Sequence, residues 1–410
     1  MSQSSTTTMA GPGVMAGRNV TPSFALIAIT GFICALGLSF AIHALLIGHM
    51  EAFGCTREVP WGLLIASYAF FASLATGLAI VSSLGQIFGV KVLQPIVGRT
   101  VFLSLAAMAT GLASISLELE NPWRVPLYAF LSPHPESNIW WKSTLYSTFL
   151  FFMLINFFLL QTGRFKAAKK AAFIALIAVA AGNLNLKADM SLIGARGFWR
   201  DQYMPLFFAT MAVLEGCGTI LFFTWLSSKI TKEDLSPEMK RALSAVGKIA
   251  LGFLLIAAMF TTWKVVEGLS PTAEHPEAMH ILLKGSFATN FWVGECLLAV
   301  ALPILLLLAS RTRNVTAMAA AGLINLVGIY YVIYDLIIVG QLVPHFHKYN
   351  VTSMPKLYSY TPSLHEYMIM IGGIFLFLTA FLLGERFFRN HGAYSGRLSV
   401  NGQENPMPNL

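Results

Sequence analysis

Carboxyl, amide and basic side chains gather where the apolar segments in the first half of this sequence end. Tyr68 lies about 10 Å inside one segment, at 1.5 Å per helical residue, and Glu118 closes the next. A pocket here would offer hydrogen-bond donors, a group that exchanges protons and apolar walls, which a quinone ring and its prenyl tail require. We expect proton exchange at Glu118, Glu120 and Asp189, and ring contacts from Trp61, Tyr68, Arg124, Asn183, Asn185 and Lys187. Alternatively, the acids only cap helices and form ion pairs at the water interface.

A second set of charged residues falls inside the apolar segments of the second half. Charges buried in hydrocarbon are costly unless they are paired or wetted, and a chain of them can move protons. A proton path is therefore expected along Glu215, Lys264, Glu267, Glu295 and Asp335. The alternative is one buried Lys–Glu pair, with protonated acids that fix helix packing.

The composition fixes the class of protein that carries these residues. Of 410 residues, 56% are hydrophobic and only 11% are charged, and the mean hydropathy is +0.67. Soluble proteins carry roughly a quarter charged residues, so this is a polytopic protein of a lipid membrane. The net charge of +8 lies in short loops and does not indicate nucleic-acid binding.

The apolar segments predict an all-α fold with ten transmembrane helices. They are expected near 24–48, 61–88, 99–117, 139–162, 168–184, 203–228, 243–266, 290–309, 314–341 and 364–386. Ten spans place both termini on one side, where the loops and ends hold 16 basic residues against nine on the other. The positive-inside rule then predicts cytoplasmic termini in a prokaryotic inner membrane.

Short matches between the two halves predict an internal duplication. Asn138-Ile-Trp-Trp and Asn290-Phe-Trp-Val open segments four spans apart, which preserves orientation. We therefore expect two tandem four-helix bundles, 61–186 and 203–341, with helices 1 and 10 flanking them inside a membrane domain of 23–388. Residues 1–22 read as a disordered leader and 389–410 as a flexible tail.

Several cofactor classes are disfavoured by motif and spacing. The four cysteines are scattered along the sequence and form no CxxC motif, so iron–sulfur clusters, covalent haem and zinc sites are not expected. His43 is the one histidine well inside a predicted span, whereas b-type haem needs two that face each other. No nucleotide-binding motif occurs.

Motifs at the span ends, taken in order, resemble those of the NrfD/polysulfide-reductase membrane subunit family in its ten-span form. They are Pro60-Trp-Gly-Leu63, Leu117-Glu-Leu-Glu-Asn-Pro-Trp-Arg124, Tyr203-Met-Pro-Leu-Phe-Phe208, Asn290-Phe-Trp292…Glu295…Pro303, Gly340-Gln-Leu-Val-Pro344 and Tyr360-Thr-Pro-Ser-Leu-His-Glu366. The resemblance covers about residues 20–388. Two positions depart from the family: Asn185 replaces a histidine of some relatives, and Val332-Ile333 replaces an Asn-Arg pair before Tyr334.

The resemblance implies an integral subunit without haem or iron–sulfur cluster of its own, which exchanges electrons between membrane menaquinone or ubiquinone and a partner. That partner would be an iron–sulfur, ferredoxin-like subunit on the outer loops, with further catalytic or cytochrome subunits beyond it. It also implies a quinone pocket in the first bundle, where Tyr68, Glu118, Glu120 and Asn185 fall. Two other functions stay open: a structural anchor without quinone turnover, and a proton-coupled secondary transporter.

Overall fold

The computed structural model describes residues 21–192, 197–199, 203–270, 276–344 and 355–388, and this part of the chain is helical without strands. Its ten long apolar helices confirm the predicted polytopic all-α fold. The membrane-length helices are α1 (Phe24–Ile47), α3 (Leu63–Gln86), η1 with α4 (Lys91–Ile96, Val97–Glu118), α6 (Asn138–Gln161), α7 (Phe165–Leu192), α8 (Met204–Thr231), α9 (Pro237–Gly268), η3 with α11 (Asn290–Ala301, Leu302–Ala309), α12 (Val315–Leu342) and α13 (Leu364–Phe387). Short helices are α2 (His49–Ala52), α5 (Arg124–Leu131), η2 (Gly197–Trp199) and α10 (Pro276–Leu283).

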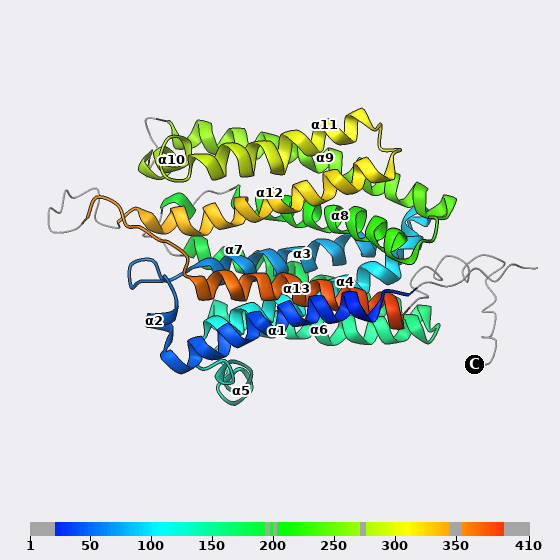
Figure 1. Cartoon of the computed structure of the whole chain (residues 1–410), viewed down its shortest axis with the longest axis horizontal. Helices are drawn as coiled ribbons and strands as arrows, with labels where there is room; N and C mark the ends of the chain where they lie inside the picture. Colours follow the sequence, from blue (N-terminus) through cyan, green and yellow to red (C-terminus); the bar gives the residue numbers. More distant parts are fainter. Residues whose placement is uncertain (1–20, 193–196, 200–202, 271–275, 345–354, 389–410) are drawn as a thin grey trace, which may run out of the picture.

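The long helices lie side by side, and the start of α1 meets the end of α13 (Figure 1). Arg386 donates to the carbonyl of Pro22 at 2.7 Å and its guanidinium lies 3.5 Å from the centroid of the Phe24 ring. We call this the termini end of the protein. The opposite end, which carries α2, α5 and α10, is the distal end.

Two sets of neighbouring helices follow each other along the chain. Helices α3, α4, α6 and α7, here the first helix group, pack on one another, as do α8, α9, η3–α11 and α12, here the second helix group. Helix α1 packs on α13 and is the most exposed span, so its apolar surface faces lipid. The duplication and the limits of the two predicted bundles stay predictions, and residues 1–20 and 389–410 lie outside the described part.

The two groups meet where α3 crosses α8 at glycines. A Cβ on Gly77 would overlap the carbonyl oxygen of Ala212, and a Cβ on Gly216 would overlap the backbone of Gly77. In a membrane no hydrophobic effect drives helices together, so close backbone packing supplies the attraction. These glycines therefore set the distance between the groups.

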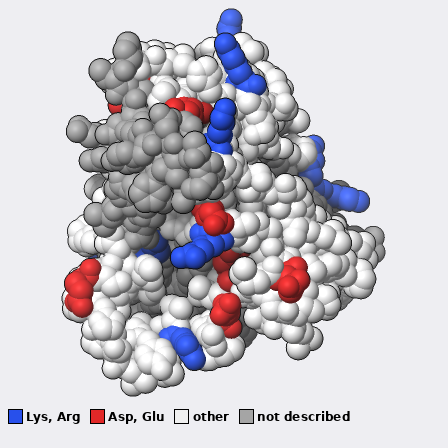
Figure 2. All heavy atoms as spheres, turned by 90° about the vertical axis from the view of Figure 1, so that its left-hand side faces the viewer, with Lys and Arg blue, Asp and Glu red and all other residues white. Residues whose placement is uncertain are grey.

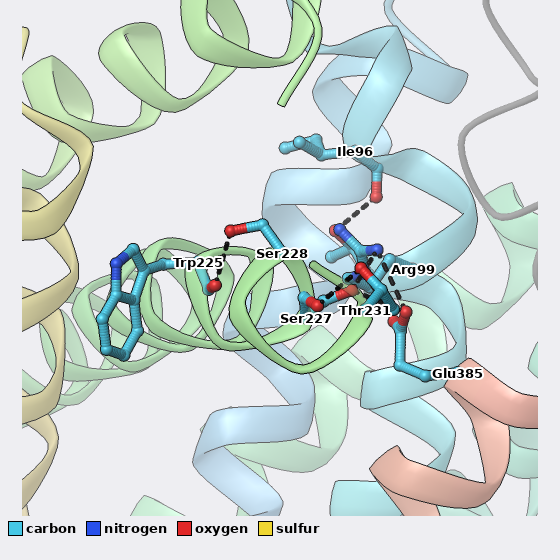
Figure 3. Close-up of polar contacts among 8 residues, drawn as sticks. Ile96, Arg99, Trp225, Ser227, Ser228, Thr231 and Glu385 are labelled. Carbon is cyan, nitrogen blue, oxygen red and sulfur yellow. Dashed lines mark hydrogen bonds and ion pairs between the residues drawn. The ribbon is translucent and has the colours of Figure 1, made fainter. Parts of the chain in front are cut away.

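A buried ion pair joins α13 to both groups near the termini end (Figure 3). Arg99 Nε on α4 lies 2.8 Å from Glu385 Oε1 on α13, and Arg99 Nη2 donates to Ser227 Oγ on α8 at 3.0 Å. The Ser227 hydroxyl donates to Glu385 Oε2 at 2.6 Å. Because both charges are largely buried and each has its partner, the triad holds three helices in register.

The glycine crossing predicts that Gly77→Ala destabilises the protein by about 1–3 kcal/mol, the usual cost of overpacking. The measurement is the thermal unfolding midpoint in detergent, followed by a thiol-reactive dye that reaches the buried Cys217 on unfolding. Gly252→Ala on α9 is the matched control, because nothing lies within 4 Å of its Cβ position. Equal unfolding midpoints for the two variants would contradict the close backbone contact between α3 and α8 at Gly77.

The triad predicts that Arg99→Met is strongly destabilising, because it leaves Glu385 buried without its counter-charge. The expected loss is about 3–5 kcal/mol, and the double variant Arg99→Met/Glu385→Met should recover much of it. The same thiol assay measures both. A double variant that is no more stable than Arg99→Met would show that the charge pair is not the source of the loss.

Candidate functional site

Asparagine amides without partners occupy the distal part of the first helix group. Asn185 Nδ2 on α7 donates to Asn138 Oδ1 at the start of α6, at 3.4 Å. The Asn138 amide nitrogen and the Asn183 and Asn185 amide oxygens are buried and make no hydrogen bond among the described residues. An unsatisfied polar group in a dry interior costs free energy, so such a set is typical of a site that a ligand or water completes.

Two tyrosines lie in the interior of this group. The rings of Tyr68 on α3 and Tyr146 on α6 meet edge to face, with centroids 6.4 Å apart. The Tyr146 hydroxyl donates to the carbonyl of Gly182 on α7 at 3.2 Å, and its ring lies against the space that a Cβ on Gly182 would fill. Asn185 and Asp189 follow Gly182 on α7 at intervals of three and four residues. This spacing places Asn185 and the backbone of Asp189 on the same face of α7 as Gly182.

Glu118 ends α4 beside a second carboxyl group. Cys55 Sγ lies 3.8 Å from Glu118 Oε1 and 4.0 Å from Glu366 Oε1. Burial first, and then the two carboxylates, raise the pKa of Cys55, so its thiol is a donor. Glu118 Oε2 is buried without a hydrogen-bond partner in the described part of the chain.

Glu366 is a fully buried carboxylate that was not among the predicted site residues. It accepts hydrogen bonds from the backbone N–H groups of Gly54 (2.8 Å), Leu63 (3.3 Å) and Ser363 (2.9 Å) and from the Tyr360 hydroxyl. Burial and this carboxylate raise the pKa of Tyr360, which keeps its hydroxyl protonated. The Ser363-x-x-Glu366 capping box was the available signal, but it indicates only a helix start.

The other residues predicted for the first site are exposed, make other contacts or have side chains that cannot be placed. Glu120 and Arg124 are exposed at the distal end. Trp61 stacks on Trp199 with centroids 5.2 Å apart, and its backbone exchanges hydrogen bonds with the Gln341 amide. The side chains of Lys187 and Asp189 lie outside the described residues.

Three of the five residues predicted for a proton path do come together. Lys264 Nζ on α9 lies 2.5 Å from Glu295 Oε2 on η3, and the carboxyl groups of Glu295 and Asp335 are in contact. Glu295 Oε1 and Asp335 Oδ2 make no hydrogen bond of good geometry with any described residue. Two carboxyl groups this close repel each other when both are ionised and can hydrogen-bond to each other only when one carries a proton, so we expect one shared proton here.

The π-helical backbone of η3 arranges this cluster. Asn290 Nδ2 donates to Asp335 Oδ1 at 2.9 Å, and Glu295 follows five residues later. Residues five apart are slightly more than one turn apart in a π-helix and point in similar directions, whereas in an α-helix they would point about 140° apart. Near the end of η3, Asn325 Nδ2 of α12 donates to the carbonyl of Ala299 at 2.7 Å.

The remaining two candidates stay apart from this cluster. Glu267 is exposed and accepts from Trp263 Nε1 at 2.8 Å. Glu215 is fully buried on α8 beside Ser73 of α3, and neither of its oxygens has a hydrogen bond of good geometry among the described residues. The proton path therefore stays a prediction as a whole.

One further contact was missed by sequence reasoning. His365, in the first turn of α13, lies 2.8 Å from His43 of α1 (Nε2 to Nδ1), with the rings stacked. Within the described residues, no group of three or more His, Cys, Asp or Glu side chains could hold a metal ion.

Comparison with known proteins relates this architecture to one family. The sequence profile described as "Polysulphide reductase, NrfD" matches residues 51–345. The chain is similar to the Hdr-like menaquinol oxidoreductase integral membrane subunit of Archaeoglobus fulgidus, with 27% identity covering 89% of this chain and 93% of the relative. It is also similar to a selenate reductase subunit of Mesobacillus selenatarsenatis, with 22% identity covering 86% and 91%.

The shared proton predicts that Asp335→Asn is tolerated. An asparagine amide can keep the acceptor for Asn290 and place a permanent donor toward Glu295, as a protonated aspartic acid does. Asp335→Leu removes the acceptor for Asn290 and the donor toward Glu295. It should lower the free energy of unfolding by about 1–3 kcal/mol, because both residues lose a buried partner. Unfolding midpoints of the two variants provide the check, and an Asn variant as unstable as the Leu variant would argue for an unprotonated pair.

Proposed function

Because the chain belongs to the polysulphide reductase NrfD family, we propose that it is the quinone-interacting membrane subunit of a multi-subunit oxidoreductase. The two relatives are named as subunits of a menaquinol oxidoreductase and of a selenate reductase, which supports this role. The first of these names favours menaquinone as the substrate. The bias of basic residues supports a prokaryotic inner membrane with both termini in the cytoplasm.

The proposed quinone site is the distal part of the first helix group. The observation that carries it is the set of buried polar atoms without partners on Glu118, Asn138, Asn183 and Asn185. A quinone carbonyl accepts hydrogen bonds, which amide N–H₂ groups or the Tyr68 hydroxyl can donate. A quinol hydroxyl donates, and the amide oxygens and Glu118 Oε2 can accept.

Glu118 is the residue we assign to proton exchange. Its Oε2 atom is available, and its Oε1 atom has only a weak thiol donor. Oxidation of a quinol releases two protons and two electrons. Glu118 would take these protons one after the other and pass each to the aqueous phase at the distal end. The two electrons would pass to an iron–sulfur partner docked on the distal loops, with further catalytic or cytochrome subunits beyond it.

The distal face is the proposed docking surface for that partner. Figure 2 shows a few acidic and basic side chains there, among uncharged atoms around a hollow. The short helices α2, α5 and α10 lie at this end. A partner bound there would be close to the proposed quinone site, which shortens the path for electrons.

This assignment predicts that Glu118→Gln lowers quinol-dependent turnover of the assembled complex at least tenfold. General acid–base groups contribute about 10²–10⁴-fold, and the amide keeps the size of the side chain but cannot take the proton. Turnover is measured with a short-chain menaquinol and, separately, with a soluble dye that reacts directly with the partner subunits.

Glu51→Gln is the matched control, because Glu51 is an exposed acid of α2 at the same end of the protein and its loss should change turnover less than twofold. Dye-dependent activity should stay normal in both variants, which shows that the complex is assembled. Normal quinol turnover in Glu118→Gln, and in Asn185→Leu as well, would support a structural anchor instead.

A further inference from the structure

A cavity of about 1010 Å³ lies between α12 and α13, and none of the residues that line it belongs to the proposed quinone site. These two helices run on either side of α3 (Figure 1), and α3 and α8 form the floor of the groove between them. Phe70, Phe71 and Leu74 of α3 line it, whereas Tyr68 points toward Tyr146 on α6. Helix α3 therefore separates two distinct sites.

The groove follows the helices and is open to hydrocarbon along its length. Its walls run from Leu323 to Tyr334 on α12 and from Tyr367 to Leu378 on α13, each about 17 Å at the α-helical rise. Val327 and Ile374, at the edges, are 45% and 40% exposed. A ligand could therefore enter sideways from the bilayer.

Polarity changes from one end of the groove to the other. Ser286, Asn290, Ser359 and Thr361 line its distal end, and Leu226, Leu323 and Leu378 line the end nearer the termini. The loop that forms the distal rim is fixed, because Tyr358 N–H donates to the Leu342 carbonyl at 2.8 Å and Tyr360 is hydrogen-bonded to Glu366. An occupant would therefore have a small polar head at the distal end and an apolar tail.

The described residues of the lining carry no charge, which indicates the kind of lipid that could bind. In this part of the chain the lining includes six phenylalanines and six tyrosines but no Lys, Arg, His, Asp or Glu. An anionic phospholipid head would require basic side chains near its phosphate. Aromatic walls instead suit a flat neutral ring, which they contact face to face or edge to face.

We propose that this groove is a second binding site for an isoprenoid quinone. The ring lies at the Asn290 end, between the Tyr330 and Tyr334 side chains, and the prenyl tail follows α12 and α13 toward the termini end. Asn290 also donates to Asp335, so the ring is adjacent to the carboxyl pair of the second helix group. The proposal rests on the proposed function only for the chemical class of ligand.

The test is to count the quinone bound to the purified native complex and to map a menaquinone that carries a photoreactive group on its tail. We expect two quinones per chain, with crosslinks on peptides of α12 and α13. Ile374→Trp fills the groove and should remove one quinone and those crosslinks. Ile256→Trp on α9 is the matched control, since Ile256 is 39% exposed, lies outside the groove and should leave both unchanged.

The outcomes of these experiments distinguish failure of the groove as a second site from failure of the proposed first quinone site. Loss of one quinone in Asn185→Leu, with the crosslinks on α12 and α13 retained, supports two independent sites. One quinone per chain, lost in Asn185→Leu and retained in Ile374→Trp, would overturn the groove and leave the first site standing. Absence of crosslinks from wild-type α12 and α13 would overturn it even if Ile374→Trp fails to fold. A phospholipid or a partner helix in the groove would also overturn it.

Discussion

The interior of this protein depends on one constraint: hydrocarbon offers no hydrogen bonds, so the chain has to satisfy its own polar groups. Asn325 illustrates the rule, because its amide donates to the Ala299 carbonyl near the junction of η3 and α11. Arg99 and Glu385 obey it with a charge pair. The amide oxygens of Asn183 and Asn185 have no partner among the described residues. A ligand or water has to provide the missing hydrogen bond there, so a functional site is expected at these residues.

The position of α3 links the fold to both proposed sites. Contact at Gly77 and Gly216 brings its backbone against α8, which leaves one face of α3 for the first helix group and another for the groove beside α12 and α13. Tyr68 lies on the first face and Phe70 on the second. Because one helix forms a wall of each site, a shift of α3 would change both.

The sequence predicts most of the spans and the chemistry of the candidate residues, but not their partners. Hydropathy places nearly every helix start and end within a few residues, since the bilayer sets the length of an apolar helix. Periodicity cannot reveal the π-helix at Asn290 or the contact between His43 and His365, because both depend on helices distant in sequence. The groove was missed for the same reason: its apolar residues read individually as ordinary core or lipid-facing positions.

The number of donors around each buried carboxyl group separates structural from reactive acids. Glu366 accepts three backbone N–H groups and the Tyr360 hydroxyl, so its lone pairs are occupied and a change in its protonation would break the distal rim. Glu118 has one weak thiol donor and an unoccupied oxygen, so it can gain or lose a proton while the structure stays intact. Although the two groups are neighbours around Cys55, only Glu118 has an oxygen available for the proton exchange that we propose, and Glu366 fixes the surrounding loops.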